Sequence, residues 1–221
     1  MTESTDDERA TAIEAMSDAG RNFYRFGWVH AGSGNLSCRL DDNTLLVTTT
    51  GAHLGSLDDE AFIDVDFDGQ PVDDGQPSGD VELHLAIVRA VDDAAAVFHV
   101  HHPEAALCSD RDHKRGFTHL HELQLIHALG VDTDGDEPEV DIPVVEARYE
   151  TDEMIDAVTG AIDDDEFDAP CVNVKNHGLY VWGPDLEAAR RRVEALAYLY
   201  EYAWQRPMNP KRSSSISGFD T

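Results

Sequence analysis

The chain has 221 residues, 41% of them hydrophobic, and its 45 Asp and Glu residues outnumber 16 Lys and Arg residues to give a net charge of −29. This length suits one large domain with a substantial core. The charge argues against a nucleic-acid partner, because phosphate backbones are also negative. Salt screens the repulsion between like charges, so an acidic, lysine-poor chain suits a salt-rich cytoplasm. We therefore predict a halophilic source, with an ordinary acidic bacterial protein as the alternative.

The sequence gives no sign of export or membrane insertion. It contains no apolar run long enough to span a membrane, and residues 1–7 are acidic and polar, unlike a signal peptide. Its three cysteines, Cys38, Cys108 and Cys171, lack CxxC spacing and are too few for a disulfide framework. We predict a cytoplasmic protein without membrane contact.

Hydrophobic periodicity and turn residues predict helices and strands that alternate along the chain. Helices are expected at residues 7–26, 80–91, from 103 onward, 120–129, 151–162 and 185–204, with Thr151 capping its helix. Strands are expected at residues 35–40, 44–49, 62–67, 95–101, 140–145, 171–175 and 179–182. Several neighbouring strands are joined too tightly for crossovers, which predicts an α/β fold with a mixed, largely antiparallel sheet covered by helices. We expect one domain over residues 1–205 and a mobile tail over residues 206–221.

Two histidines in a β-rich run, His99 and His101, are expected on the same side of one strand because they are two residues apart. His177 lies beside Gly178, where the backbone can turn sharply, and can complete a set of three imidazoles. Three neutral imidazoles with an open position are typical of a catalytic zinc site, although they also suit manganese, iron or cobalt. The alternative is ordinary buried or surface histidines. His102 is expected opposite His101, and the four histidines between residues 112 and 127 on loops or helix surfaces.

Polar turns and one carboxylate are further candidates. Backbone N–H groups in small turns can bind a phosphate, helped by a helix N-terminus, although glycine turns are usually only turns. Turns of this kind contain Gly34 and Asn35, Thr50 and Gly51, and Ser78 before the predicted helix at residue 80. Glu122 precedes an apolar stretch. It is either a first-turn carboxylate that stabilises a helix or a general acid/base that faces the metal.

The order and spacing of five motifs resemble the class II aldolase/adducin family over residues 11–204. The motifs lie at residues 33–37, 49–51, 77–80, 98–101 and 176–178. The resemblance implies a three-layer α/β/α fold, one zinc ion per subunit, and a homotetramer with sites near subunit interfaces. It also implies roles for individual residues: His99, His101 and His177 as zinc ligands, Glu122 as catalytic acid/base, and Asn35, Thr50, Gly51 and Ser78 as phosphate ligands. Asp80 stands where aldolases and many bacterial dehydratases carry a glutamate, which is the acid/base of the aldolases. Asp80 is one methylene shorter, so it is a further catalytic candidate but weakens the aldolase alternative without excluding it.

Within the family, the stretches at residues 51–55, 62–69, 142–146 and 177–183 are most similar to a branch that acts in methionine salvage. This similarity implies a lyase that dehydrates 5-methylthioribulose 1-phosphate to 2,3-diketo-5-methylthiopentyl 1-phosphate. One alternative is a class II aldolase that cleaves a ketose 1-phosphate, such as a fuculose or 5-deoxypentulose phosphate, to dihydroxyacetone phosphate and an aldehyde. Another is a non-catalytic adducin-like module, which needs no metal.

Overall fold

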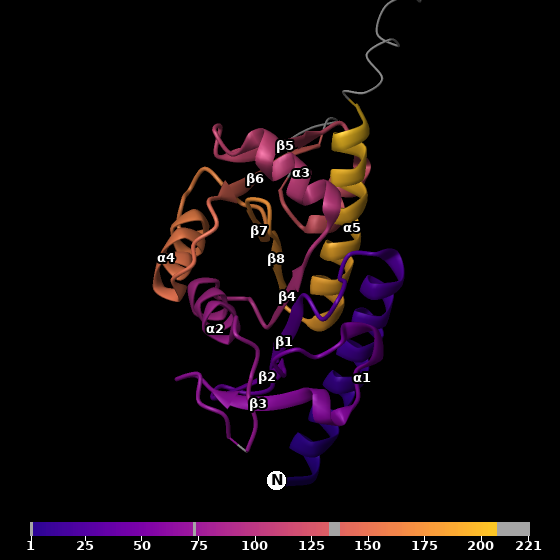
Figure 1. The fold of residues 1–221 in the computed structure, drawn as a ribbon, viewed down its shortest axis with the longest axis vertical. Coiled ribbons are helices and arrows are strands. Elements are labelled where there is room, and N and C mark those ends of the chain that lie inside the picture. Colours follow the sequence, from indigo (N-terminus) through magenta and orange to yellow (C-terminus); the bar gives the residue numbers. More distant parts are fainter. Residues whose placement is uncertain (1, 73, 133–137, 207–221) are drawn as a thin grey trace, which may run out of the picture.

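The centre of the protein is one eight-stranded sheet (Figure 1). The structure is a computed structural model that describes residues 2–72, 74–132 and 138–206. The strands follow the order β3-β2-β1-β4-β8-β7-β6-β5, and every neighbouring pair is antiparallel except β6 and β7. Their bounds are β1 Asn35–Arg39, β2 Thr44–Thr48, β3 Phe62–Asp66, β4 Ala96–Val100, β5 Phe117–His121, β6 Glu139–Val145, β7 Cys171–Val174 and β8 Gly178–Gly183.

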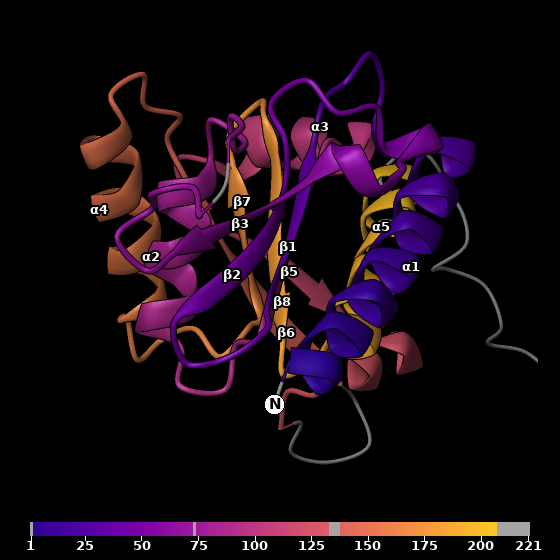
Figure 2. The same cartoon turned by 90° about the horizontal axis from the view of Figure 1, so that it is seen from below.

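Helices cover both faces of this sheet. The α-helices are α1 Thr2–Phe26, α2 Val81–Ala90, α3 Pro103–Asp112, α4 Thr151–Ile162 and α5 Leu186–Gln205, and the 3-10 helices are η1 Leu54–Ser56, η2 Asp59–Ala61 and η3 Gln124–Leu129. Figure 2 shows α2 and α4 on one side of the sheet and α1 and α5 on the other. Met16 and Leu196 belong to one core cluster, and Leu85 and Val158 to the second. The predicted three-layer α/β/α architecture is therefore confirmed.

The central strands are buried because helices cover both faces of the sheet. Every residue of β4, β7 and β8 is buried, which is typical of strands covered by helices on both sides. A polar side chain in such a strand costs free energy unless it finds partners. His99 in β4 is the clearest case, and its partners form the candidate site described below.

One predicted helix is wrong. Residues 120–129 do not form a helix, because Leu120 lies in β5 and only Gln124–Leu129 forms a 3-10 helix. In β5, Thr118 and Leu120 are buried while the alternate residues Phe117, His119 and His121 are partly exposed, and the strand pairs with β6. This alternation with a period of two determines the local structure, and the helical interpretation of the apolar residues overlooked it.

The predicted helix ends need smaller corrections. Thr151 is the first helical residue of α4, and the cap position belongs to Glu150, which makes no side-chain cap hydrogen bond. At α5 the cap is Asp185, whose carboxylate accepts a hydrogen bond from the backbone N–H of Ala188 at 2.6 Å. The α1 helix begins at Thr2, earlier than expected. The predicted tail lies outside the described residues apart from Arg206. No helix within the described ranges is long and apolar enough to cross a membrane.

Candidate metal centre

Three histidines from two neighbouring strands converge on one point. His99 is buried within β4, His101 lies just after the end of that strand, and His177 occupies the turn between β7 and β8. The Nε2 atom of His99 lies 2.9 Å from Nε2 of His101 and 3.1 Å from Nε2 of His177. Within the described part of the chain, this is the one group of three potential metal ligands close enough to share an ion. The structure thus brings together the three residues predicted as ligands.

The short segment that follows His177 shapes this group. Asn176 has a left-handed backbone conformation, with φ of 55°, which turns the chain toward β8. Gly178 lies so close to β4 that a methyl group there would overlap the Val100 carbonyl oxygen. The next carbonyl group, that of Leu179, accepts a hydrogen bond from Nδ1 of His99 at 3.0 Å. Because a carbonyl oxygen only accepts, the proton of His99 lies on Nδ1 and its Nε2 lone pair faces the other two rings.

The electrostatics of the three rings suit a cation. Burial lowers the pKa of all three histidines, and the neighbouring rings lower that of His99 further. For His101 the pKa falls to about 4. All three imidazoles are therefore neutral at neutral pH and can donate lone pairs. The ligand nitrogens of a tetrahedral zinc ion lie about 3.3 Å apart, given bonds of about 2.0–2.1 Å. The separations of 2.9 and 3.1 Å fit such an ion within a few tenths of an ångström.

A carboxylate lies beside the three histidines. Asp80 precedes the first turn of α2, and its charge favours the protonated forms of His101 and His177. Asn35 donates a hydrogen bond from Nδ2 to Oδ2 of Asp80 at 2.6 Å, and the Tyr180 phenol lies near enough to feel the charge of this carboxylate. Burial raises the pKa of the Tyr180 phenol, and the Asp80 charge raises it further, so the hydroxyl keeps its proton. The Asn35 amide therefore helps to hold Asp80 at the site.

The predicted phosphate turns approach the same end of the sheet. The backbone N–H of Thr50 donates to the carbonyl of Gln76, and that of Ser78 donates to the carbonyl of Thr48, each at 3.0 Å. These bonds join the turn after β2 to the segment that leads into α2. Among the described residues no acceptor is found for the N–H of Gly51 or Gly79. Two free donors beside a helix N-terminus are a suitable environment for an anion.

The fold agrees with comparisons to known proteins. The model of the class II aldolase and adducin N-terminal domain family matches residues 14–204. The chain belongs to this family. It is 33% identical over 199 residues to "Methylthioribulose-1-phosphate dehydratase" of Sulfurihydrogenibium sp., covering 88% of this chain and 90% of that protein. The protein of the same name from Methylococcus capsulatus is 34% identical over 200 residues, covering 89% and 94%.

A solved structure supports the fold of this class II aldolase family member. The L-fuculose-1-phosphate aldolase of Thermus thermophilus superposes with a TM-score of 0.73, covering 90% of this chain and 97% of that one. At 21% identity this likeness concerns the fold alone. The three-layer arrangement is thus shared with an enzyme of known structure.

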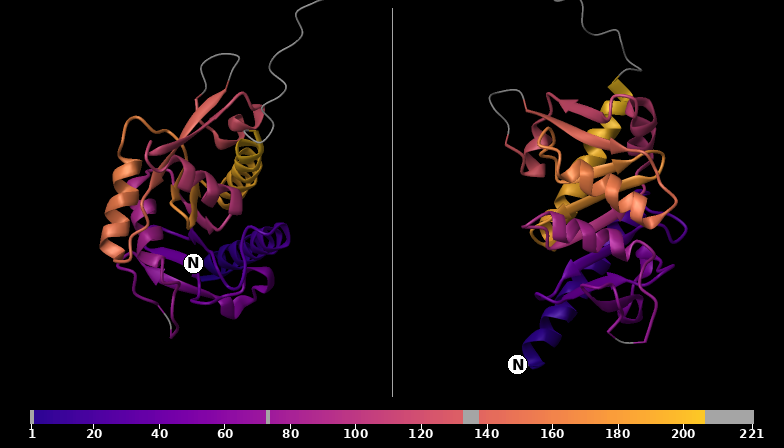
Figure 3. Two further views of the ribbon diagram at one scale, coloured as in Figure 1. Left: turned by 45° about the horizontal axis from the view of Figure 1, so that its top comes forward. Right: turned by 90° about the vertical axis from the view of Figure 1, so that its left-hand side faces the viewer.

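Glu122, the predicted acid/base, lies elsewhere in this family member. It follows β5 at the edge of the sheet, at the end opposite β3 (Figure 3). Four strand-to-strand steps separate β5 from β4, which corresponds to about 19 Å across the sheet. Oε2 of Glu122 lies 2.7 Å from Nη2 of Arg206 and 3.7 Å from Nδ1 of His121. Within one chain, the described structure therefore does not bring Glu122 to the three histidines.

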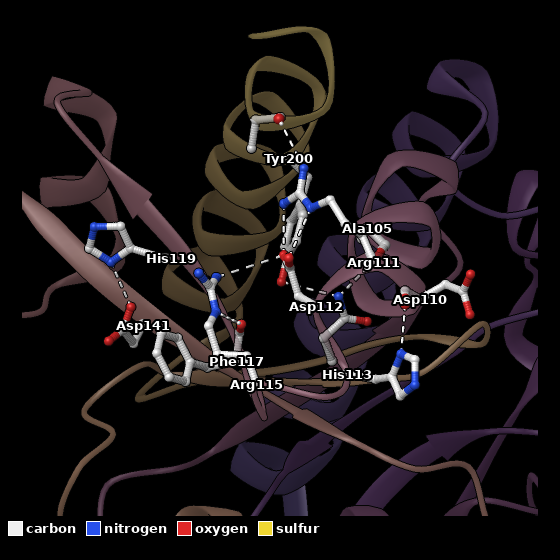
Figure 4. A network of polar contacts seen from close by, with 12 residues as sticks. Ala105, Asp110, Arg111, Asp112, His113, Arg115, Phe117, His119, Asp141 and Tyr200 are labelled. Atoms are coloured by element: carbon white, nitrogen blue, oxygen red, sulfur yellow. Dashed lines mark hydrogen bonds and ion pairs between the residues drawn. The ribbon is translucent and has the colours of Figure 1, made fainter. Parts of the chain in front are cut away.

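The other histidines have different surroundings. His113 contacts the carbonyl of Asp110 through Nδ1 at 2.6 Å, and Nδ1 of His119 lies 2.7 Å from Oδ1 of Asp141 (Figure 4). His119 and His121 are not on a helix, because they lie two residues apart on β5 and stack with their ring centroids 4.9 Å apart. His102 precedes α3 and packs against Trp28. None of the four belongs to a metal-ligand group in the described chain.

Two residues near the site were not anticipated from the sequence. Tyr180 stacks on His99, with ring centroids 4.0 Å apart and planes 6° apart. His84 in α2 is fully buried, its Nδ1 lies 2.7 Å from Oγ of Ser37, and burial lowers its pKa to about 4. A signal existed for His84, which follows Asp80 by one helical turn and so faces the same way. For Tyr180 the only local signal was its position after the predicted ligand turn.

Proposed function

We propose that this protein is a zinc-dependent lyase that removes water from 5-methylthioribulose 1-phosphate to give 2,3-diketo-5-methylthiopentyl 1-phosphate, a step of methionine salvage. The observation that carries the proposal is the convergence of the Nε2 atoms of His99, His101 and His177 in a member of the class II aldolase and adducin family. The two relatives that are 33% and 34% identical over most of the chain carry the name of this dehydratase. A site made of neutral imidazoles suits zinc, and zinc supplies Lewis-acid polarisation of a substrate oxygen when bound.

The residues around the histidines have separate tasks in this proposal. The carbonyl of Leu179 keeps His99 in the tautomer whose Nε2 can bind the ion. The phosphate binds in the turns of Thr50, Gly51 and Ser78, because free N–H donors and the start of α2 favour an anion there. Asn35 already donates its amide to Asp80, so we assign it to the sugar end of the phosphate site, where it orients that carboxylate.

Dehydration requires one group that first accepts and then returns a proton. Glu122 takes the proton from C3, the electron pair of the C–H bond forms a C3–C4 double bond, and the C4 hydroxyl leaves. The same carboxyl group returns its proton to the departing hydroxyl, which leaves as water. The resulting enol then rearranges to the diketone. Overall, the substrate loses one hydrogen and one hydroxyl group as water, and no oxidant is needed.

We propose that Glu122 performs this task in the site of a neighbouring subunit. About 19 Å of sheet separates β5, which precedes Glu122, from β4, which carries the central ligand His99 of the same chain, and this is too far for proton transfer. A homotetramer with sites near its interfaces removes this difficulty, because the edge strand β5 of one chain can approach the metal centre of another. Arg206 then holds the Glu122 side chain in place through its 2.7 Å contact.

The main alternative is a class II aldolase that breaks the C3–C4 bond of a ketose 1-phosphate. The observation that favours it is Asp80, a carboxylate that lies beside the histidines of its own chain. The purified protein should be incubated with 5-methylthioribulose 1-phosphate and with fuculose 1-phosphate. Formation of the diketone supports the dehydratase, whereas formation of dihydroxyacetone phosphate contradicts it. A folded protein that contains no metal after purification and takes up none would instead favour an adducin-like binding module.

A further inference from the structure

We propose that Tyr180 is a positioning residue of the metal centre, which aligns His99 by stacking on its ring and orients Asp80 through its hydroxyl group. The role of the Tyr180 hydroxyl in turnover rests on the proposed function. The alignment of His99 concerns metal binding and can be tested without any substrate.

Strand pairing explains why the two rings meet. His99 and Tyr180 lie directly opposite each other on the antiparallel strands β4 and β8, so their side chains point to the same face of the sheet. Their rings are nearly parallel, with an angle of 6° and a centroid separation of 4.0 Å. On another side, His84 contacts the Tyr180 ring edge-on at 6.0 Å. Tyr180 is therefore fixed itself and can restrict the rotation of the His99 ring.

Two adjacent residues of β8 thus control both the tautomer of the buried His99 and the orientation of its ring. The Leu179 carbonyl fixes which nitrogen of His99 carries the proton, and the Tyr180 ring fixes the plane in which Nε2 points. Groups that orient metal-binding histidines typically change metal affinity or activity by about 10–100-fold when they are removed. A structural role for the Tyr180 ring alone would leave metal affinity unchanged once the fold is intact.

The hydroxyl group has a distinct task. Tyr180 is 2% exposed and lies in an apolar core cluster, where an unpaired hydroxyl would cost free energy. The charge of Asp80 acts on this phenol, and Asp80 accepts a hydrogen bond from Asn35, so we assign the Tyr180 hydroxyl as a second donor to Asp80. In this proposal the two donors together hold the Asp80 carboxylate beside His101 and His177. Phenylalanine at position 180 would keep the stacking and remove only this hold on Asp80.

Two variants separate the two tasks, and a third serves as a matched control. Tyr180→Phe removes the hydroxyl, and Tyr180→Leu removes the ring. Tyr200→Phe removes the hydroxyl of another fully buried tyrosine. Tyr200 belongs to the other core cluster, and its hydroxyl accepts a hydrogen bond from Nδ2 of Asn173. The dissociation constant for Co²⁺ is measured on metal-free protein by chelator competition, together with the visible spectrum of bound Co²⁺. Turnover of 5-methylthioribulose 1-phosphate is measured on zinc-loaded protein.

We expect Tyr180→Leu to weaken Co²⁺ binding about 10–100-fold and to alter the Co²⁺ spectrum. Tyr180→Phe should keep the Co²⁺ affinity within about twofold while kcat falls about 10-fold or more and KM changes little. Tyr200→Phe should change neither. If Tyr180→Leu binds Co²⁺ with normal affinity and spectrum, or Tyr180→Phe keeps its full kcat, the corresponding part of the proposal is overturned. Should the wild type show no dehydration, loss of Co²⁺ affinity in Tyr180→Leu would still support the alignment of His99, so the two failures are distinguishable.

Discussion

A mixing experiment can test whether each site takes Glu122 from a neighbouring subunit. Two variants are needed, each defective in a different part of the site. Glu122→Gln keeps the shape of the side chain and leaves the histidines untouched. His177→Ala removes an exposed ligand in a turn, so it costs little packing. Each variant alone should be inactive: loss of an acid/base costs about 10²–10⁴-fold, and loss of a ligand removes the metal.

The expected recovery follows from counting the sites in random tetramers. A mixed site is active when its histidines come from the Glu122→Gln chain and its glutamate comes from the His177→Ala chain. At equal amounts each condition holds for half of the sites, so about a quarter of the wild-type activity should return. If Glu122 served its own chain, every site would carry one defect and no activity would return. The geometry favours the first outcome, because about 19 Å separates β5 from β4.

The two variants should be co-expressed with different tags, and the doubly tagged tetramers should be assayed for diketone formation. The matched control combines His177→Ala with His101→Ala, since both defects lie in the same set of ligands and no mixture can restore it. Metal content should be near half of the wild-type value in the test mixture and near zero in the control. Activity in the test mixture no higher than in the control would refute the assignment of Glu122 to a neighbouring site.

Three further predictions concern backbone clearance, a buried histidine and salt. Gly178→Ala should destabilise the fold by about 1–3 kcal/mol and weaken zinc binding, because the added methyl group would overlap the Val100 carbonyl next to His99; the control Gly160→Ala, where a methyl group meets open space in α4, should stabilise by up to about 1 kcal/mol. Burial lowers the pKa of His84 to about 4, so the unfolded chain binds a proton first as the pH falls. As the pH falls from about 6.5, the ordinary pKa of histidine, to about 4, the free energy of unfolding of the metal-free wild type should therefore decrease by on the order of 3 kcal/mol relative to that of His84→Asn. Urea unfolding of both proteins at each pH measures this difference. The melting temperature should rise between about 0.1 M and about 2 M salt.

Each of these outcomes has a result that would contradict it. A Gly178→Ala protein as stable as Gly160→Ala would mean that β4 and β8 adjust without strain. Parallel pH profiles for wild type and His84→Asn would mean that His84 takes up its proton without unfolding. A melting temperature that does not change with salt would remove the halophilic interpretation of the 45 acidic residues.

Local spacing predicted the features of this protein that depend on a few neighbouring residues. The two-residue spacing of His99 and His101 fixes their common side, and Gly178 marks the turn that brings in His177. Most strands and helices follow for the same reason, since their apolar periods are clear. The region around β5 was mispredicted, because the burial of Thr118 and Leu120 depends on pairing with β6 and covering by helices.

Features that depend on strand order could not be found in the same way. The stacking of Tyr180 on His99 requires the register between β4 and β8, and these two residues are 81 positions apart in the sequence. The distance between Glu122 and the histidines depends on the three strands that lie between β5 and β4. A resemblance assigned Glu122 a role by its position in the sequence, and its location on the sheet is the reason we propose that this role is performed across an interface.

The separation of the histidines from Glu122 also predicts how salt should affect activity. Each chain carries a net charge of −29, so bringing chains together is opposed by repulsion that reaches about 10 Å at 0.1 M salt but only about 3 Å at 1 M. The three histidines belong to a single chain, so we expect their site to hold an ion without a partner chain. On lowering the salt concentration, we therefore expect tetramers and dehydration to be lost together while zinc content and helical structure persist. Light scattering, metal analysis and circular dichroism at each salt concentration provide the test. Full activity in a monomeric, metal-loaded protein would contradict both the assembly of the site from two chains and the need for salt.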